Sequence, residues 1–110
     1  MSAETMSTPS SGNVFADLGL PDPEQDLLKA NLVHAVADVI RLRGLSQKDA
    51  AALLRTDQAK VSAILRGRIS GFSTDRLLRF LAALGHNVTI VVDPHQNGQG
   101  AVAVTMGTGV

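Results

Sequence analysis

The most constraining feature of the sequence is a pair of short predicted helices, within residues 46–67, that almost no chain separates. Ser46 and Asp57 can each cap a helix N-terminus, because their side-chain oxygens accept a hydrogen bond from a first-turn amide. The first helix is expected to end near Leu54 and the second to run from Gln58 to Arg66. The chain must therefore turn sharply between two capped helices.

Two further helices are predicted on either side of this pair. The earlier one has Asp22 as its N-cap and continues to Arg43, and the later one is capped by Ser73 and closes at Gly85. Apolar residues recur in the four helices at the spacing of a buried helix face. These predicted core residues are Leu28, Leu32, Ala35, Val36, Val39, Ile40, Leu54, Val61, Ile64, Leu65, Leu77, Leu78, Leu81 and Leu84.

After Gly85 the pattern changes to a β-branched run, Val88 to Val92, which ends at Asp93-Pro94 and predicts one short strand. A single strand needs a partner. That partner is either the same strand in a second copy or the weaker run Ala101–Thr105. We favour a homodimer with Val88, Ile90 and Val92 in its interface, because Ala-rich, Gly-flanked segments form poor strands.

These patterns predict an all-α fold: a compact bundle of four to five helices that contains a helix-turn-helix, followed by one short C-terminal β-strand used in dimerisation. We expect residues 1–12 to form a disordered N-terminal tail. Residues 13–92 are expected to form the domain with its dimerisation strand, and residues 93–110 a flexible Gly-rich tail.

Charge is distributed unevenly although the net charge of the 110-residue chain is zero. Nine basic and only three acidic residues lie between Arg41 and Phe80, so this stretch carries about +6. Such a basic stretch is typical of a face that binds nucleic-acid phosphates, although a solvated charged surface is an equal alternative on charge alone.

One face of the second short helix is suited to the major groove of DNA. Val61, Ile64 and Leu65 fall on one side of a helical projection, and small or polar residues fall opposite them. Gln58 is suited to a bidentate contact with adenine, while cations beside it would bind phosphates. The predicted DNA-binding residues are Ser46, Gln47, Arg55, Asp57, Gln58, Ala59, Lys60, Ser62, Arg66 and Arg68.

Composition argues against several other classes of protein. The chain has no Cys, which excludes disulfides and thiolate metal sites, and residues 1–12 lack the pattern of a signal peptide. No segment is apolar enough to cross a membrane, so we expect a cytoplasmic protein. His34, His86 and His95 have no metal-ligand spacing and no obvious nucleophile beside them. We therefore expect no catalytic residues, no metal and no cofactor.

The segment Gly44–Leu54 followed by Asp57–Gly67 resembles the Xre-type, or lambda-repressor-like, helix-turn-helix family. The resemblance implies that Gln58, Ala59 and Ser62 lie at base edges, and that Gln47 and Lys60 meet the DNA backbone or flanking bases. Two residues depart from the family pattern. Arg55 stands where a turn Gly is usual, and Thr56 stands where an aliphatic residue is usual.

The segment Ile69–Gly85 and the Val88–Val92 strand resemble more specifically the HigA-like antitoxins. The resemblance implies a repressor, expected to act on its own operon as a homodimer at a palindromic operator in double-stranded DNA. A second function, neutralisation of a RelE-like toxin, is also implied. Its surface would be residues 13–20 and the acidic start of the first helix, although residues 13–20 could equally cover the domain's own core.

Overall fold

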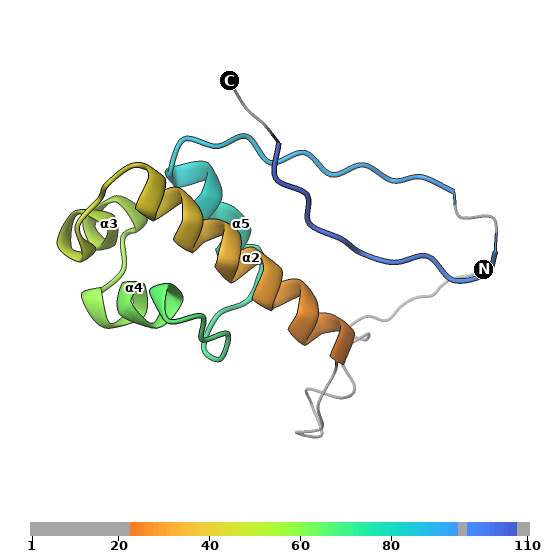
Figure 1. Cartoon of the computed structure of the whole chain (residues 1–110), viewed down its shortest axis with the longest axis horizontal. Helices are drawn as coiled ribbons and strands as arrows, with labels where there is room; N and C mark the ends of the chain where they lie inside the picture. The colour runs from red at the N-terminus through yellow and green to blue at the C-terminus, as the bar shows by residue number, and fades with distance from the viewer. Residues whose placement is uncertain (1–22, 95–96, 108–110) are drawn as a thin grey trace.

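The computed structural model describes residues 23–94 and 97–107, and it contains four helices in this part of the chain. These are α2 (Pro23–Leu42), α3 (Gln47–Leu54), α4 (Gln58–Leu65) and α5 (Thr74–Ala83). The long α2 packs against α4 and α5, while α3 contacts α4 and α5 (Figure 1). The predicted helical bundle with its helix-turn-helix is thereby confirmed.

Local hydrogen bonds set the starts of three helices where the sequence predicts them. Ser46 Oγ accepts from the amide of Asp49 at 3.0 Å, and Asp57 Oδ1 accepts from the amide of Lys60 at 2.8 Å. Ser73 Oγ accepts from the amide of Arg76 at 3.1 Å. Each bond satisfies a first-turn amide that has no partner within its helix. The predicted cap at Asp22 lies outside the described residues.

The core is apolar, and it contains no buried polar or charged residue among those the structure describes. Most of the predicted core is buried, and Leu28, Leu65 and Leu78 are partly buried against it. The structure adds Val33 and Ala37 on α2, because α4 and α5 together cover a wider arc of this helix than one apolar stripe predicts. Phe72 and Phe80 close the core with their rings edge to face, 6.3 Å between centroids.

The C-terminal segment differs from the prediction, because the described residues form no β-strand. Residues 86–94 are extended and leave the bundle after Gly85, and residues 97–107 return toward it (Figure 1). No backbone hydrogen bond joins these two segments. Since a strand is defined by its ladder, an extended segment without a partner is not a strand. The dimerisation role of Val88, Ile90 and Val92 thus stays a prediction.

Candidate nucleic-acid interface

The turn between α3 and α4 is held by backbone hydrogen bonds and by one residue with left-handed backbone. Arg55, the C-cap of α3, has φ 56° and ψ 47°, and the amide of Thr56 donates to the carbonyl of Ala51 at 2.9 Å. Only glycine adopts this conformation without a steric cost from its Cβ. The position does therefore require the geometry that a turn glycine normally supplies, and here an arginine adopts it.

α3 packs against α4, and Ala51 on α3 is buried, with only 5% of the residue exposed. A methyl group fits this crossing, whereas a longer side chain would separate the two helices. The neighbouring Ala52 is exposed. Of these two neighbouring alanines, only Ala51 therefore lies in the packed interior of the domain.

The two sides of α4 differ sharply in exposure. Val61 and Ile64 are completely buried, while Gln58 and Ala59 are exposed in the first turn. Ser62 is half-buried one turn later. The first turn of α4 thus presents a polar amide and a small residue to the outside, while its buried residues anchor the helix to the bundle.

The outward face of α4 is narrower than the helical projection predicts. Ala63 falls opposite Val61 in a helical projection of α4, but in the structure it is half-buried and packs against the core. Lys60 is also half-buried, and its Nζ lies 5.8 Å from the centroid of the Phe72 ring. A cation over an aromatic face is attracted by the ring electrons. Lys60 is consequently held toward Phe72, in the segment that precedes α5.

Two predicted DNA-binding residues have a structural task in the folded chain. The side chains of Ser46 and Asp57 accept the capping hydrogen bonds of α3 and α4. Ser46 retains its hydroxyl proton as a donor, whereas an ionised Asp57 carboxylate can only accept. Gln47, the first residue of α3, is exposed beside the Ser46 cap.

The cations of residues 41–80 divide into those with partners and those without. Arg41, Arg43, Lys60, Arg76 and Arg79 each contact another group of the protein. The remaining cationic side chains make no hydrogen bond, ion pair or ring contact with any described residue: Lys48, Arg55, Arg66 and Arg68. Lys48, in the first turn of α3, was not among the predicted DNA-binding residues.

Arg41 and Arg43 each donate a hydrogen bond to a backbone carbonyl of the protein itself. Arg41 Nη2 donates to the carbonyl of Leu65 at 2.8 Å, and Arg43 Nη1 donates to the carbonyl of Leu84 at 2.9 Å. Each guanidinium thus caps the C-terminal end of another helix, where carbonyls and the helix dipole favour a cation. Residues two positions apart on a helix point about 200° away from each other. The spacing of Arg41 and Arg43 in the sequence therefore already indicates that they do not lie on one face.

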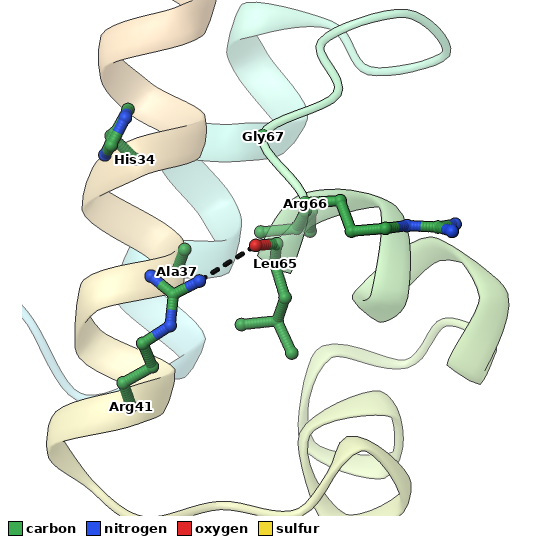
Figure 2. A pocket seen from close by; sticks show the side chains of 7 residues that line it. His34, Ala37, Arg41, Leu65, Arg66 and Gly67 are labelled. Atoms are coloured by element: carbon green, nitrogen blue, oxygen red, sulfur yellow. Dashed lines mark hydrogen bonds between the residues drawn. The ribbon is translucent and has the colours of Figure 1, made fainter.

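Figure 2 shows the Arg41 bond spanning a shallow pocket of about 170 Å³ between α2 and the end of α4. Arg66 lines one side of this pocket, but its side chain extends away from α2 (Figure 2). His34 is exposed on α2 and also points away. The pocket therefore has no converging polar groups apart from Arg41, which is already bonded.

Thr56 and Arg76 join the turn to α5. Arg76 Nη2 lies 3.4 Å from Thr56 Oγ1, and its guanidinium carbon lies 5.5 Å from the centroid of the Phe80 ring. A donor–acceptor distance of 3.4 Å is long for a hydrogen bond. The hydroxyl at the usual aliphatic position therefore has a partner, but a weak one.

The described residues contain no group of three or more His, Cys, Asp or Glu side chains that could hold a metal ion. Within the same residues, no helix is long and apolar enough to span a membrane.

Comparison with known proteins identifies the family. A family model described as a helix-turn-helix domain matches residues 14–93. A solved structure that carries the name of an XRE-family transcriptional regulator has 36% sequence identity and a TM-score of 0.70, covering 81% of this chain and all of its own. No curated protein matches the sequence. The chain therefore belongs to the helix-turn-helix family and is a DNA-binding transcriptional regulator of the XRE type, not an enzyme.

Proposed function

We propose that the protein is a repressor that reads a palindromic operator with α4 in the major groove, and that it regulates its own operon. The observation that carries this proposal is the first turn of α4, where Gln58 and Ala59 are exposed while Val61 and Ile64 are completely buried. Buried anchors fix the helix, so the exposed amide has a defined direction toward a base edge.

Gln58 is the proposed base-reading residue. Its amide can donate to and accept from adenine in the major groove, and the small Ala59 beside it lets the helix approach closely. Ser62, one turn later, is half-buried and can reach a base or a phosphate at the edge of this contact. Base contacts at these positions would provide the sequence preference.

The cations without partners are the proposed phosphate contacts. Arg66 and Arg68 follow α4, and Arg55 precedes it. Lys60, whose ammonium lies over the Phe72 ring, is proposed as a further phosphate contact along the side of α4. At the start of α3, Ser46, Gln47 and Lys48 surround a helix N-terminus, where amides and the dipole also favour a phosphate. These contacts would supply affinity that depends on salt and little on sequence. Asp57 would contribute by capping α4 so that its first turn is ordered.

The protein is proposed to bind as a homodimer. A dimer would place two copies of α4 about one turn of DNA, 34 Å, apart, which is what a palindromic site requires. Val88, Ile90 and Val92 are the proposed interface, because Ile90 and Val92 are 75% and 89% exposed and Val88 is 41% exposed. Exposed β-branched side chains of this size are normally covered in a functional assembly.

Fluorescence anisotropy on DNA from directly upstream of the protein's own gene, against a scrambled duplex of equal length, tests this function. The wild type should prefer the upstream duplex by about 10³ or more, and raising salt from about 50 to about 200 mM should weaken binding to both. The substitution Gln58→Ala should weaken binding to the upstream duplex by about 1–3 kcal/mol and leave binding to the scrambled duplex unchanged.

Arg66→Ala is the matched comparison, because a phosphate contact should weaken binding to both duplexes equally. Equal, weak binding of the wild type to both duplexes would refute regulation at that site. An unchanged preference in Gln58→Ala would place the reading of bases elsewhere.

A second candidate function is the binding of a RelE-like toxin, as in the HigA-like antitoxins. The start of α2 favours it, because Leu27 is 61% exposed and directly follows the first turn that carries the acidic Glu24 and Asp26. An exposed apolar side chain with acidic neighbours suits a basic nuclease. The predicted toxin-binding residues 13–20 lie outside the described residues.

Co-expression with the product of the adjacent gene tests the second function. If that product is toxic, the wild type should restore growth, and Leu27→Asp should abolish the rescue without changing operator binding. Growth that does not depend on this chain would refute the antitoxin role and leave the repressor role standing.

A further inference from the structure

Residues 88–92 combine exposed apolar side chains with an unused backbone. Ile90, Val91 and Val92 are 75%, 72% and 89% exposed. In the described part of the chain, the last backbone hydrogen bond along the sequence is donated by His86 to Leu81, and residues 87–94 and 97–107 make none. An extended segment with free amides, free carbonyls and β-branched side chains is an open template for strand pairing.

Residues 101–105, the segment of the same chain that could pair with residues 88–92, do not do so. Residues 101–105 form no backbone hydrogen bond with residues 88–92. Val104 is half-buried and packs against the core instead, and Val102 remains 74% exposed. The second segment is thus tied to the bundle through one side chain, and the edge of residues 88–92 is available to another molecule.

The sequence of this segment is complementary to itself. In an antiparallel pair related by a two-fold axis perpendicular to the sheet, opposite residues share a face, so the axis passes midway between one residue and its copy, and that residue is said here to be on the axis. With Ile90 on the axis, Val88 lies opposite the partner's Val92, and Thr89 lies opposite the partner's Val91. Every one of the five pairs then joins two β-branched side chains, a residue type that is enriched in strands.

The neighbouring registers lack this match. An axis through Val91 would place Thr89 opposite Asp93 and Val88 opposite Pro94, whereas an axis through Thr89 would place Val92 opposite His86. With Ile90 on the axis, Pro94 falls outside the five pairs, where its missing N–H is not needed by the ladder. The registers with Thr89 or Val91 on the axis are therefore less favourable than the register with Ile90 on the axis.

We propose that two copies of this chain pair antiparallel through residues 88–92, with Ile90 on the two-fold axis. This inference rests on the proposed function as a dimeric operator-binding protein, and it adds the register of the interface. Because α5 ends at Ala83, only a few residues before residue 88, the paired strands would join the two bundles close to their cores and relate their α4 helices by the same axis.

The absence of Cys from the sequence makes the register directly testable. Directly opposite residues in an antiparallel pair have Cα atoms about 4.5–5.5 Å apart, which a disulfide can bridge. Ile90→Cys, oxidised gently in the full-length chain without DNA, should form a covalent dimer. Val88→Cys or Val92→Cys alone should form much less dimer, whereas an equimolar mixture of the two should form a mixed dimer.

Val102→Cys is the matched control, because Val102 is 74% exposed and Ile90 is 75% exposed. Dimer formation at equal rates by Ile90→Cys and Val102→Cys would overturn the proposal, since it would reflect random collision. Faster self-linking by Val91→Cys than by Ile90→Cys would overturn the register, and a wild type that stays monomeric in sedimentation would overturn the pairing. Helix content measured before oxidation confirms that each exposed-site variant is folded.

Operator binding by the wild type is measured separately, so the two ideas fail independently. Specific binding by a wild type whose Ile90→Cys variant does not cross-link would reject this interface and retain the repressor. Cross-linking at Ile90 by a protein without operator preference would retain the interface and reject the repressor.

Discussion

Arg41 Nη2 lies 2.8 Å from the carbonyl oxygen of Leu65, so a guanidinium at the end of α2 donates a hydrogen bond to the C-terminal end of α4. Arg43 makes the equivalent bond to Leu84 at the end of α5. The end of one helix therefore holds the ends of two others. Both arginines belong to the basic stretch that the sequence offers to DNA, but the fold uses them for its own stability.

Replacing Arg41 should destabilise the protein without removing a phosphate contact. Arg41→Ala is expected to lower the free energy of unfolding by about 0.5–1.5 kcal/mol, at the modest end for a charged donor because the side chain is 56% exposed. Urea unfolding followed by circular dichroism measures this. Arg79→Ala, which removes only the exposed pair with Asp75, should cost about 0–0.5 kcal/mol. Equal losses in both variants would contradict the capping role.

We expect Arg55 to lower the stability of the fold and to raise its affinity for DNA. Arg55→Gly removes the Cβ from a residue at φ 56° and is expected to raise the free energy of unfolding by about 0.5–1 kcal/mol, part of the relief being offset by the flexibility of glycine when unfolded. It should also weaken DNA binding and reduce the slope of log affinity against log salt by about 0.9, the contribution of one phosphate.

Arg55→Ala separates these two effects, because alanine keeps the Cβ and loses the cation. It should therefore weaken DNA binding as much as Arg55→Gly but give no gain in stability. If Arg55→Gly binds the operator as tightly as the wild type at low salt, Arg55 makes no contact with DNA.

Thr56→Val should be nearly neutral for stability. The hydrogen bond from Arg76 to Thr56 Oγ1 is 3.4 Å long, so its loss should cost little, and a half-buried valine gains contacts at a position where an aliphatic residue is usual. We expect a change within about 0.5 kcal/mol in thermal or urea unfolding. A loss of more than about 1.5 kcal/mol would show that the hydroxyl contributes fully to the turn.

The crossing of α3 and α4 should not accept a larger side chain at Ala51. Ala51→Leu is expected to cost about 1–3 kcal/mol or more, because the added atoms have no space between two packed helices. Ala52→Leu adds the same atoms at an exposed position of the same helix, and it should change the unfolding free energy by less than about 0.5 kcal/mol. Similar results for both variants would mean that the crossing tolerates the added volume.

The amino-acid sequence by itself determined the helix ends and most of the core. The capping bonds at Ser46, Asp57 and Ser73 join residues three positions apart. Whether each bond forms therefore depends on the local sequence alone. The apolar spacing of α4 predicted the burial of Val61 and Ile64 for the same reason, since one helix carries both residues.

Only the tertiary structure decided which cations make no contact within the protein and whether residues 88–92 pair as a β-strand. Arg41 and Arg43 reach carbonyls 24 and 41 residues away, and no local pattern shows which distant helix end will lie beside them. Ala63 packs against the core because neighbouring helices cover part of the face that a projection of α4 alone leaves open. Residues 88–92 have β-strand patterning but no ladder, because a strand is made by a partner and not by its own sequence.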